Sequence, residues 1–75
     1  ESTLKAYVVN GELRVSLAEE DRPYSVEVVS LDGRTLDSFN NVSSADTRID
    51  LSHLSGFAIV KVRQGNNTCV VKAAL

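Results

Sequence analysis

Apolar residues recur at every second position over several short stretches of the chain. In an extended strand, alternate side chains face the same side, so this spacing predicts β-strands rather than helices. Seven strands are expected, at Leu4–Val8, Leu13–Leu17, Tyr24–Leu31, Arg34–Asn40, Thr47–Ser52, Phe57–Arg63 and Thr68–Ala74.

Residues that favour turns separate these stretches. Asn10-Gly11 and Asp32-Gly33 suit tight hairpins, because Asn and Gly adopt positive φ at little cost. The segment 40–46 is rich in Asn, Ser and Asp, which predicts a loop. The segment 52–56 is too short for a helix, and we expect a turn that directs Leu54 into the core.

Three details of the strands are also predicted. The apolar pattern changes phase between Val28 and Val29, which indicates a bulge or a strand end that is buried on both faces. The strand over 34–40 is irregular, and we expect it to kink near Asp37-Ser38. The stretch 57–63 is apolar on both sides, which places it at the centre of a sheet, and 64–67 forms the turn after it.

Seven short strands with regular turns and no helical pattern predict an all-β fold. The first interpretation is an immunoglobulin-like antiparallel β-sandwich, and a barrel is the alternative. A chain of 75 residues can bury one hydrophobic core, so residues 1–75 are expected to form a single domain. A homodimer formed by edge pairing of the final strand stays open.

The composition excludes several classes of function. Hydrophobic residues make up 43% and charged residues 24% of the chain, as in ordinary globular proteins. Eight Lys and Arg against ten Asp and Glu give a net charge of −2, so we expect no basic surface for nucleic acid or anionic lipid. The apolar runs are far shorter than the roughly 20 residues that cross a bilayer. The absence of Met indicates a processed product or a piece of a longer protein.

Few residues could carry chemistry. One Cys and one His form neither a disulfide nor a zinc site, so no metal and no cofactor are expected. Cys69 is on a predicted inward face, where a thiol behaves as a small hydrophobe. His53 lies between Ser52 and Ser55 without an orienting partner in the local sequence, and we expect it to face solvent on a turn. The chain is therefore expected not to be an enzyme.

The acidic residues and two glycosylation sequons are further candidate sites. Asp46 and Asp50, like the segment 19–21, lack the spacing of a calcium loop and are interpreted as solvated surface. Asn41-Val42-Ser43 and Asn66-Asn67-Thr68 match the N-glycosylation sequon, and both fall on predicted turns. The glycines do not have the spacing of a phosphate-binding loop.

The order of four segments resembles a known family. They are YSVEVVSLDGR at 24–34, IDLSHLSG at 49–56, IVKVR at 59–63 and VK at 71–72. Together they resemble the C-terminal sorting domain of the type IX secretion system, over most of the chain. The residues that match its motifs are Leu31, Asp32, Gly33 and Arg34 at a strand-end turn, Gly56, the strand residues Val60, Lys61 and Val62, and Lys72.

The resemblance implies that the domain is a sorting signal for secretion. Members of the family are immunoglobulin-like sandwiches at the C-terminus of secreted or outer-membrane-surface proteins in one phylum of Gram-negative bacteria. They follow a cargo domain and catalyse nothing. After passage through the periplasm the outer-membrane secretion machinery recognises them, and a sortase-like surface protease often removes them.

The chain departs from the family at two places. The segment 7–11 stands where the family has Pro-Asn-Pro, and Ala58 stands where it has an aromatic residue, with Phe57 as a neighbour. Both changes fall in segments that bear on recognition. A second interpretation therefore stays open, in which the chain is a structural or interaction module, such as a stalk, of a secreted bacterial protein.

Overall fold

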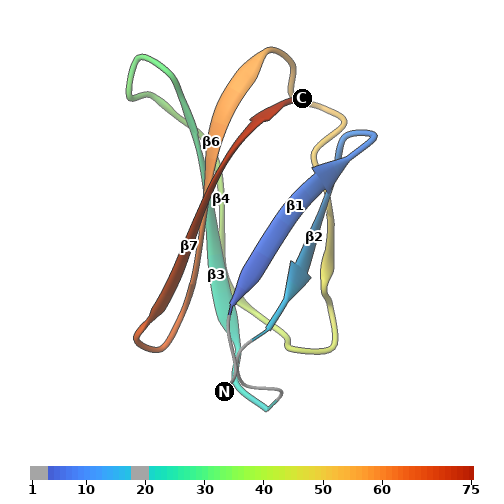
Figure 1. Cartoon of the computed structure of the whole chain (residues 1–75), viewed down its shortest axis with the longest axis vertical. Coiled ribbons are helices and arrows are strands. Elements are labelled where there is room, and N and C mark those ends of the chain that lie inside the picture. The colour runs from blue at the N-terminus through green and yellow to red at the C-terminus, as the bar shows by residue number, and fades with distance from the viewer. Residues whose placement is uncertain (1–3, 18–20) are drawn as a thin grey trace.

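The strands pair into two antiparallel sheets in the computed structural model, which describes residues 4–17 and 21–75. Within these ranges there are seven strands and no helix. One sheet has the order β1-β2-β5 and the other the order β4-β3-β6-β7 (Figure 1). Glu19 and Glu20, which were expected in a solvated connection, lie outside the described residues. The strands are β1 (Lys5–Val9), β2 (Glu12–Ser16), β3 (Tyr24–Ser30), β4 (Thr35–Val42), β5 (Arg48–Asp50), β6 (Phe57–Gln64) and β7 (Asn67–Ala74).

The distribution of strands between the sheets is that of an immunoglobulin-like sandwich. The first, second and fifth strands form one sheet, and the third, sixth and seventh belong to the other, where β4 is added beside β3. All neighbouring strands are antiparallel. The predicted all-β sandwich of about seven strands is thus confirmed, in preference to the barrel.

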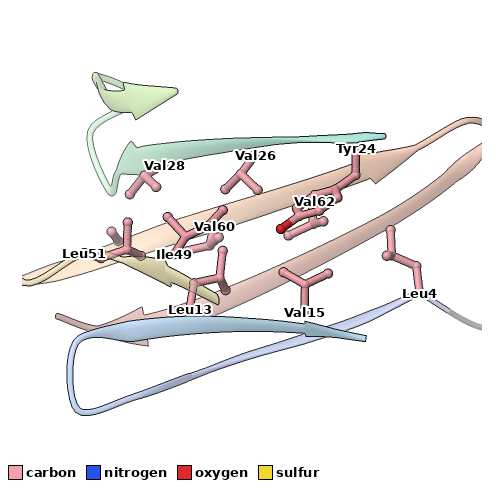
Figure 2. Packing of buried hydrophobic residues seen from close by; sticks show 11 residues of the cluster. Leu4, Leu13, Val15, Tyr24, Val26, Val28, Ile49, Leu51, Val60 and Val62 are labelled. Carbon is pink, nitrogen blue, oxygen red and sulfur yellow. The ribbon is translucent and has the colours of Figure 1, made fainter. Parts of the chain in front are cut away.

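The core lies between the two sheets and consists of the inward side chains of both. Figure 2 shows Leu13 and Val15 from β2 directed toward Val60 and Val62 from β6. Leu54 packs against this core, as expected for the turn after β5. The buried apolar residues are Leu4, Leu13, Val15, Tyr24, Val26, Val28, Ile49, Leu51, Ala58, Val60 and Val62.

The first hairpin follows directly from its turn residues. Asn10 has φ 51° and Gly11 has φ 75°, the pair of positive values that a two-residue turn between twisted strands requires. The turn fixes the register in which Val8 pairs with Leu13. The carbonyl of Gly11 accepts a hydrogen bond from Leu51 N at 2.8 Å, so this turn also contacts the end of β5.

Strand β6 is central in its sheet, as the sequence predicted. It pairs with β3 on one side and with β7 on the other, without a register shift on either side. Its residues alternate between the core and the solvent, with Ala58, Val60 and Val62 buried. Cys69 of β7 packs against the core, in agreement with the inward position predicted for it.

The expected kink of the fourth strand was misplaced, and the strand is longer than predicted. Leu36 is one extra residue opposite Val28 and Val29, which is the bulge that the change of phase indicated. A second irregularity places Asn40 and Asn41 opposite the single residue Ser25. The irregularities therefore flank positions 37–38 rather than coincide with them.

The segment 40–42 belongs to β4 and not to the loop predicted there. Asn41 has φ 55°, a left-handed conformation that Asn tolerates better than most residues, so the strand continues through the bulge. Val42 then packs against the core. The first sequon consequently starts on a strand, whereas Asn66 of the second lies on a turn, as predicted.

Gln64 was expected in a turn, but it is the last residue of β6 and only 1% exposed. Its Nε2 donates a hydrogen bond to the carbonyl oxygen of Arg22 at 2.7 Å. A buried amide needs such partners, because burial removes its hydrogen bonds to water. Gln64 thus ties the end of β6 to the segment before β3.

The two ends of the sandwich carry different segments. Figure 1 shows that β1 and β3 begin at one end, while the turn between β3 and β4 lies at the opposite end. At that opposite end, Ser30 pairs with Ala58, which pairs with Ala73, so the turn lies beside the start of β6 and the end of β7. Strand β1 also lies close to β7 of the other sheet.

Candidate functional site

The turn between β3 and β4 holds four of the residues singled out from the sequence. Ser30 N donates to the carbonyl of Arg34 at 2.7 Å, and Gly33 N donates to the carbonyl of Ser30 at 3.0 Å. The Ser30 hydroxyl donates to Asp32 Oδ1, and this hydrogen bond is the main cause that lowers the pKa of the Asp32 carboxyl. The turn is therefore fixed by its own hydrogen bonds. Its first residue, Leu31, has 56% of its surface exposed.

Gly33 is required by this turn for its backbone conformation rather than for lack of space. Its φ is 91°, in a region that L-residues rarely adopt. A Cβ at this position would meet no atom within 4 Å. A larger residue here would strain the backbone without causing a clash.

Gly56 begins the segment that leads into β6. It has φ 86°, and its carbonyl accepts a hydrogen bond from Leu75 N at 2.8 Å. This bond extends the ladder between β6 and β7 by one step beyond the pair of Phe57 with Ala74. Gly56 thus joins the start of β6 to the end of β7.

The remaining motif residues divide between the core and the solvent. Val60 and Val62 are completely buried, so they contribute to the fold and do not reach a partner from the folded domain. Lys61 and Lys72 are exposed on the opposite side of the same sheet.

We call this solvent-facing side of the four-stranded sheet the outer face. The alternation along each strand defines it, because neighbours of its residues point into the core. Lys61 pairs with Glu27 on one side and with Val70 on the other, and Ile59 lies between Val29 and Lys72. The outer face comprises Glu27 and Val29 of β3, Ser38 and Asn40 of β4, Phe57, Ile59, Lys61 and Arg63 of β6, and Thr68, Val70 and Lys72 of β7.

A groove of about 390 Å³ crosses the outer face at the end nearer the β6–β7 turn. Its lining includes Lys61 and Arg63, together with Glu27, Asn40 and Thr68. Cations, one carboxylate and neutral hydrogen-bonding groups thus meet in one depression. Sequence analysis did not single out Arg63, although the alternation that places Lys61 outward applies equally to it.

A second group of polar side chains surrounds His53. Its Nε2 lies 2.8 Å from Asp37 Oδ2, and the backbone N of Ser38 donates to Asp37 Oδ1 at 2.8 Å. The hydrogen bond with His53 is the largest cause that lowers the pKa of the Asp37 carboxyl. Hydrogen bonds from Ser52 lower the pKa of Asp50, with a smaller electrostatic effect from His53.

His53 is on the turn after β5 with its side chain 51% exposed, as predicted, but its partner Asp37 was missed. The two residues are sixteen positions apart, and no local pattern links them. Catalysis of the Ser-His-Asp type needs a nucleophile hydrogen-bonded to the imidazole. Within residues 4–17 and 21–75, Asp37 is the hydrogen-bond partner of this imidazole, and it is not such a nucleophile.

Among the described residues, His, Cys, Asp and Glu side chains form no group of three or more that could hold a metal ion. No helix of the described ranges is long and apolar enough to span a membrane.

The chain matches no protein-family model and has no significant match among curated proteins.

Proposed function

We propose that the chain is a non-catalytic C-terminal sorting domain that outer-membrane secretion machinery recognises in order to export a preceding cargo to the cell surface. The observation that carries the proposal is where the motif residues lie. The turn 31–34, Gly56, Lys61 and Lys72 all belong to the four-stranded sheet or its connections. Segments that are far apart in the sequence thus lie on one sheet or at its end, which supports recognition of the domain in its folded state.

The division between buried and exposed motif residues supports the same proposal. Val60 and Val62 secure the sheet from the inside, while Lys61 and Lys72 are available outside. A receptor that reads a folded domain needs both a rigid sheet and accessible side chains. The proposed localisation is accordingly secreted or on the outer-membrane surface, by way of the periplasm, with a sortase-like surface protease as a second partner.

The test is a fusion of residues 1–75 to the C-terminus of a periplasm-targeted reporter, in a bacterium that carries the type IX machinery. We expect the reporter on the cell surface, as measured by its accessibility to added protease or antibody. Lys61→Glu with Lys72→Glu should reduce display, whereas Lys5→Glu with Arg48→Glu, on the other sheet, should leave it unchanged. A reporter that stays in the periplasm contradicts the proposal.

A structural or interaction module, such as a stalk, is the second candidate. The observation that favours it is the exposure of Phe57 and Val70 on the outer face, 63% and 59% respectively, since exposed apolar patches mark protein contacts. A homodimer is also proposed as one form of this module. It would form through β7, which is an edge strand of its sheet. Strand β1 of the same chain lies close to β7 and would border the interface. Retention of the reporter in the periplasm, together with a stable folded fusion, would support this candidate.

A further inference from the structure

The charge of the outer face differs from that of the chain as a whole. Lys61, Arg63 and Lys72 are exposed there, whereas Glu27 is the one carboxylate of the face. Within the described ranges, no hydrogen bond or ion pair engages the side chains of these three cations. In a protein of net charge −2, this face carries three cations against one carboxylate, and that carboxylate, Glu27, is the cross-strand partner of Lys61.

Apolar side chains accompany these cations in a regular order. Phe57, Ile59, Lys61 and Arg63 follow one another along the outward side of β6, at intervals of about 6.6 Å for every second residue of a strand. Val70 lies directly opposite Lys61 on β7. A ligand with apolar groups followed by anionic groups, at the spacing of an extended chain, would match this row.

The groove supplies a place for an anionic group. Lys61 and Arg63 lie on its lining together with the single carboxylate of Glu27, so positive charge is in excess, and Ser38, Asn40 and Thr68 add neutral hydrogen-bonding groups. Carboxylates form charge-assisted hydrogen bonds with lysine and arginine, and these bonds are stronger than neutral ones. A carboxylate side chain would therefore be held in the groove by both kinds of contact.

We propose that the outer face binds an extended acidic segment of another protein, with its carboxylates at Lys61, Arg63 and Lys72 and its apolar residues over Phe57 and Val70. The partner is a peptide segment and not a membrane, because Glu27 lies in the middle of the face and would repel a layer of anionic headgroups. A peptide can place a neutral or basic residue opposite Glu27. Lys61 and Lys72 also belong to the proposed sorting surface, but the peptide binding goes beyond that role and is measured on the isolated chain without the secretion machinery.

The test is a titration of the ¹⁵N-labelled chain, followed by NMR, with the capped octapeptide Val-Ser-Val-Ser-Glu-Ser-Glu-Ser, here called the Glu-Val peptide, which places two Val and then two Glu on one face of an extended chain. We expect shifts of resonances from β6, β7 and the adjacent part of β3, with little effect on β1, β2 and β5. The octapeptide with Gln in place of Glu should bind at least about fivefold more weakly. Raising the salt from about 0.01 M to about 1 M shortens the screening length from about 30 Å to about 3 Å, and should abolish the binding.

Matched variants locate the site. Lys61→Ala with Arg63→Ala should weaken binding of the Glu-Val peptide at least about fivefold. Lys5→Ala with Arg48→Ala removes the same charge from exposed positions on the other sheet and should leave binding unchanged. The dispersion of the NMR spectrum shows whether each variant is folded.

Three results would overturn the proposal. They are equal binding of the Gln-Val peptide, equal loss in the two double variants, and binding to vesicles of phosphatidylcholine and phosphatidylglycerol without binding to the Glu-Val peptide. The sorting role is tested separately by the reporter. A chain that binds the peptide but fails to export the reporter retains this inference and loses the sorting role, and the reverse pair of results does the opposite.

Discussion

The imidazole Nε2 of His53 lies 2.8 Å from the Oδ2 atom of Asp37 and thereby joins the loop after β5 to the edge strand β4. The loop follows a strand of the three-stranded sheet, whereas β4 belongs to the four-stranded sheet. The pair is therefore a polar link across one side of the sandwich. Its position next to the core residue Leu54 makes it a sensitive point for the packing of that loop.

This link predicts a specific response to acid. The hydrogen bond from His53 holds the pKa of Asp37 below its ordinary value in the folded chain. A carboxyl whose pKa is lowered by folding stabilises the fold above its unfolded-state pKa, and this contribution is lost as the pH falls through the folded-state pKa. We expect Asp37→Asn to flatten the fall of melting temperature between about pH 5 and about pH 2.

Two further variants check the origin of the effect. His53→Phe removes the largest cause of the lowered pKa and should also flatten the acid dependence. Asp21→Asn changes an exposed carboxylate without a hydrogen-bond partner among the described residues, so its pH profile should follow the unmodified chain. Thermal unfolding monitored by circular dichroism measures all three. Parallel profiles for Asp37→Asn and the unmodified chain would contradict the prediction.

Gln64 provides a prediction about the buried polar contact at the end of β6. Replacing Gln64 by Leu removes the donor to the carbonyl of Arg22, which loses this contact. The net contribution of one such hydrogen bond to stability is about 0.5–1.5 kcal/mol, and we expect the free energy of unfolding in urea to fall by this amount. Thr68→Ala, at an exposed position four residues away, should change it by less than about 0.5 kcal/mol. Equal stabilities of the two variants would show that Gln64 is not structurally important.

Val60 and Val70 allow the assignment of inner and outer sides to be tested with the same substitution. Val60 is fully buried on β6, whereas Val70 is 59% exposed on β7. Val60→Asp buries an unpaired carboxylate, at a cost of several kcal/mol, and should unfold so small a domain. Val70→Asp places the charge in solvent and should leave a folded chain with a slightly lowered melting temperature. A folded Val60→Asp variant would refute the position of β6 in the core.

The strands themselves were predictable because a local property determines them. Residues such as Val26 and Val28, two apart and both apolar, need one buried side, and the chain satisfies this requirement in an extended conformation. The turn at Asn10-Gly11 was equally predictable, since its positive φ values suit these two residue types.

The features of the fold and of the candidate site that the sequence did not predict depend on contacts between distant segments. Asn40 and Asn41 favour loops by composition, but the packing of Val42 in the core keeps them in β4. Gln64, next to a glycine, looked like a turn residue, and only the segment before β3 explains its burial. Similarly, the register of β4 brings Asp37 to His53, and the local sequence contains no sign of that register.

The charge of the outer face shows the same limit. A net charge of −2 predicted no basic surface, because a total does not record where charges lie. The folded sheet places Lys61, Arg63 and Lys72 on one side. The alternation along β6 and β7 predicts this row of cations only under two conditions. The two strands must be known to be neighbours, and the side with Val60 and Val62 must be known to face the core.

The end of the sandwich at which β1 begins has a consequence for any protein joined ahead of this strand. Strand β1 starts at the end remote from the turn 31–34 and from the junction of Gly56 with Leu75 (Figure 1). A passenger domain attached ahead of β1 would lie at the opposite end of the sandwich and would leave those segments accessible. Under the proposed sorting role, passengers of very different size could therefore precede the same domain without covering the turn 31–34 or the junction of Gly56 with Leu75.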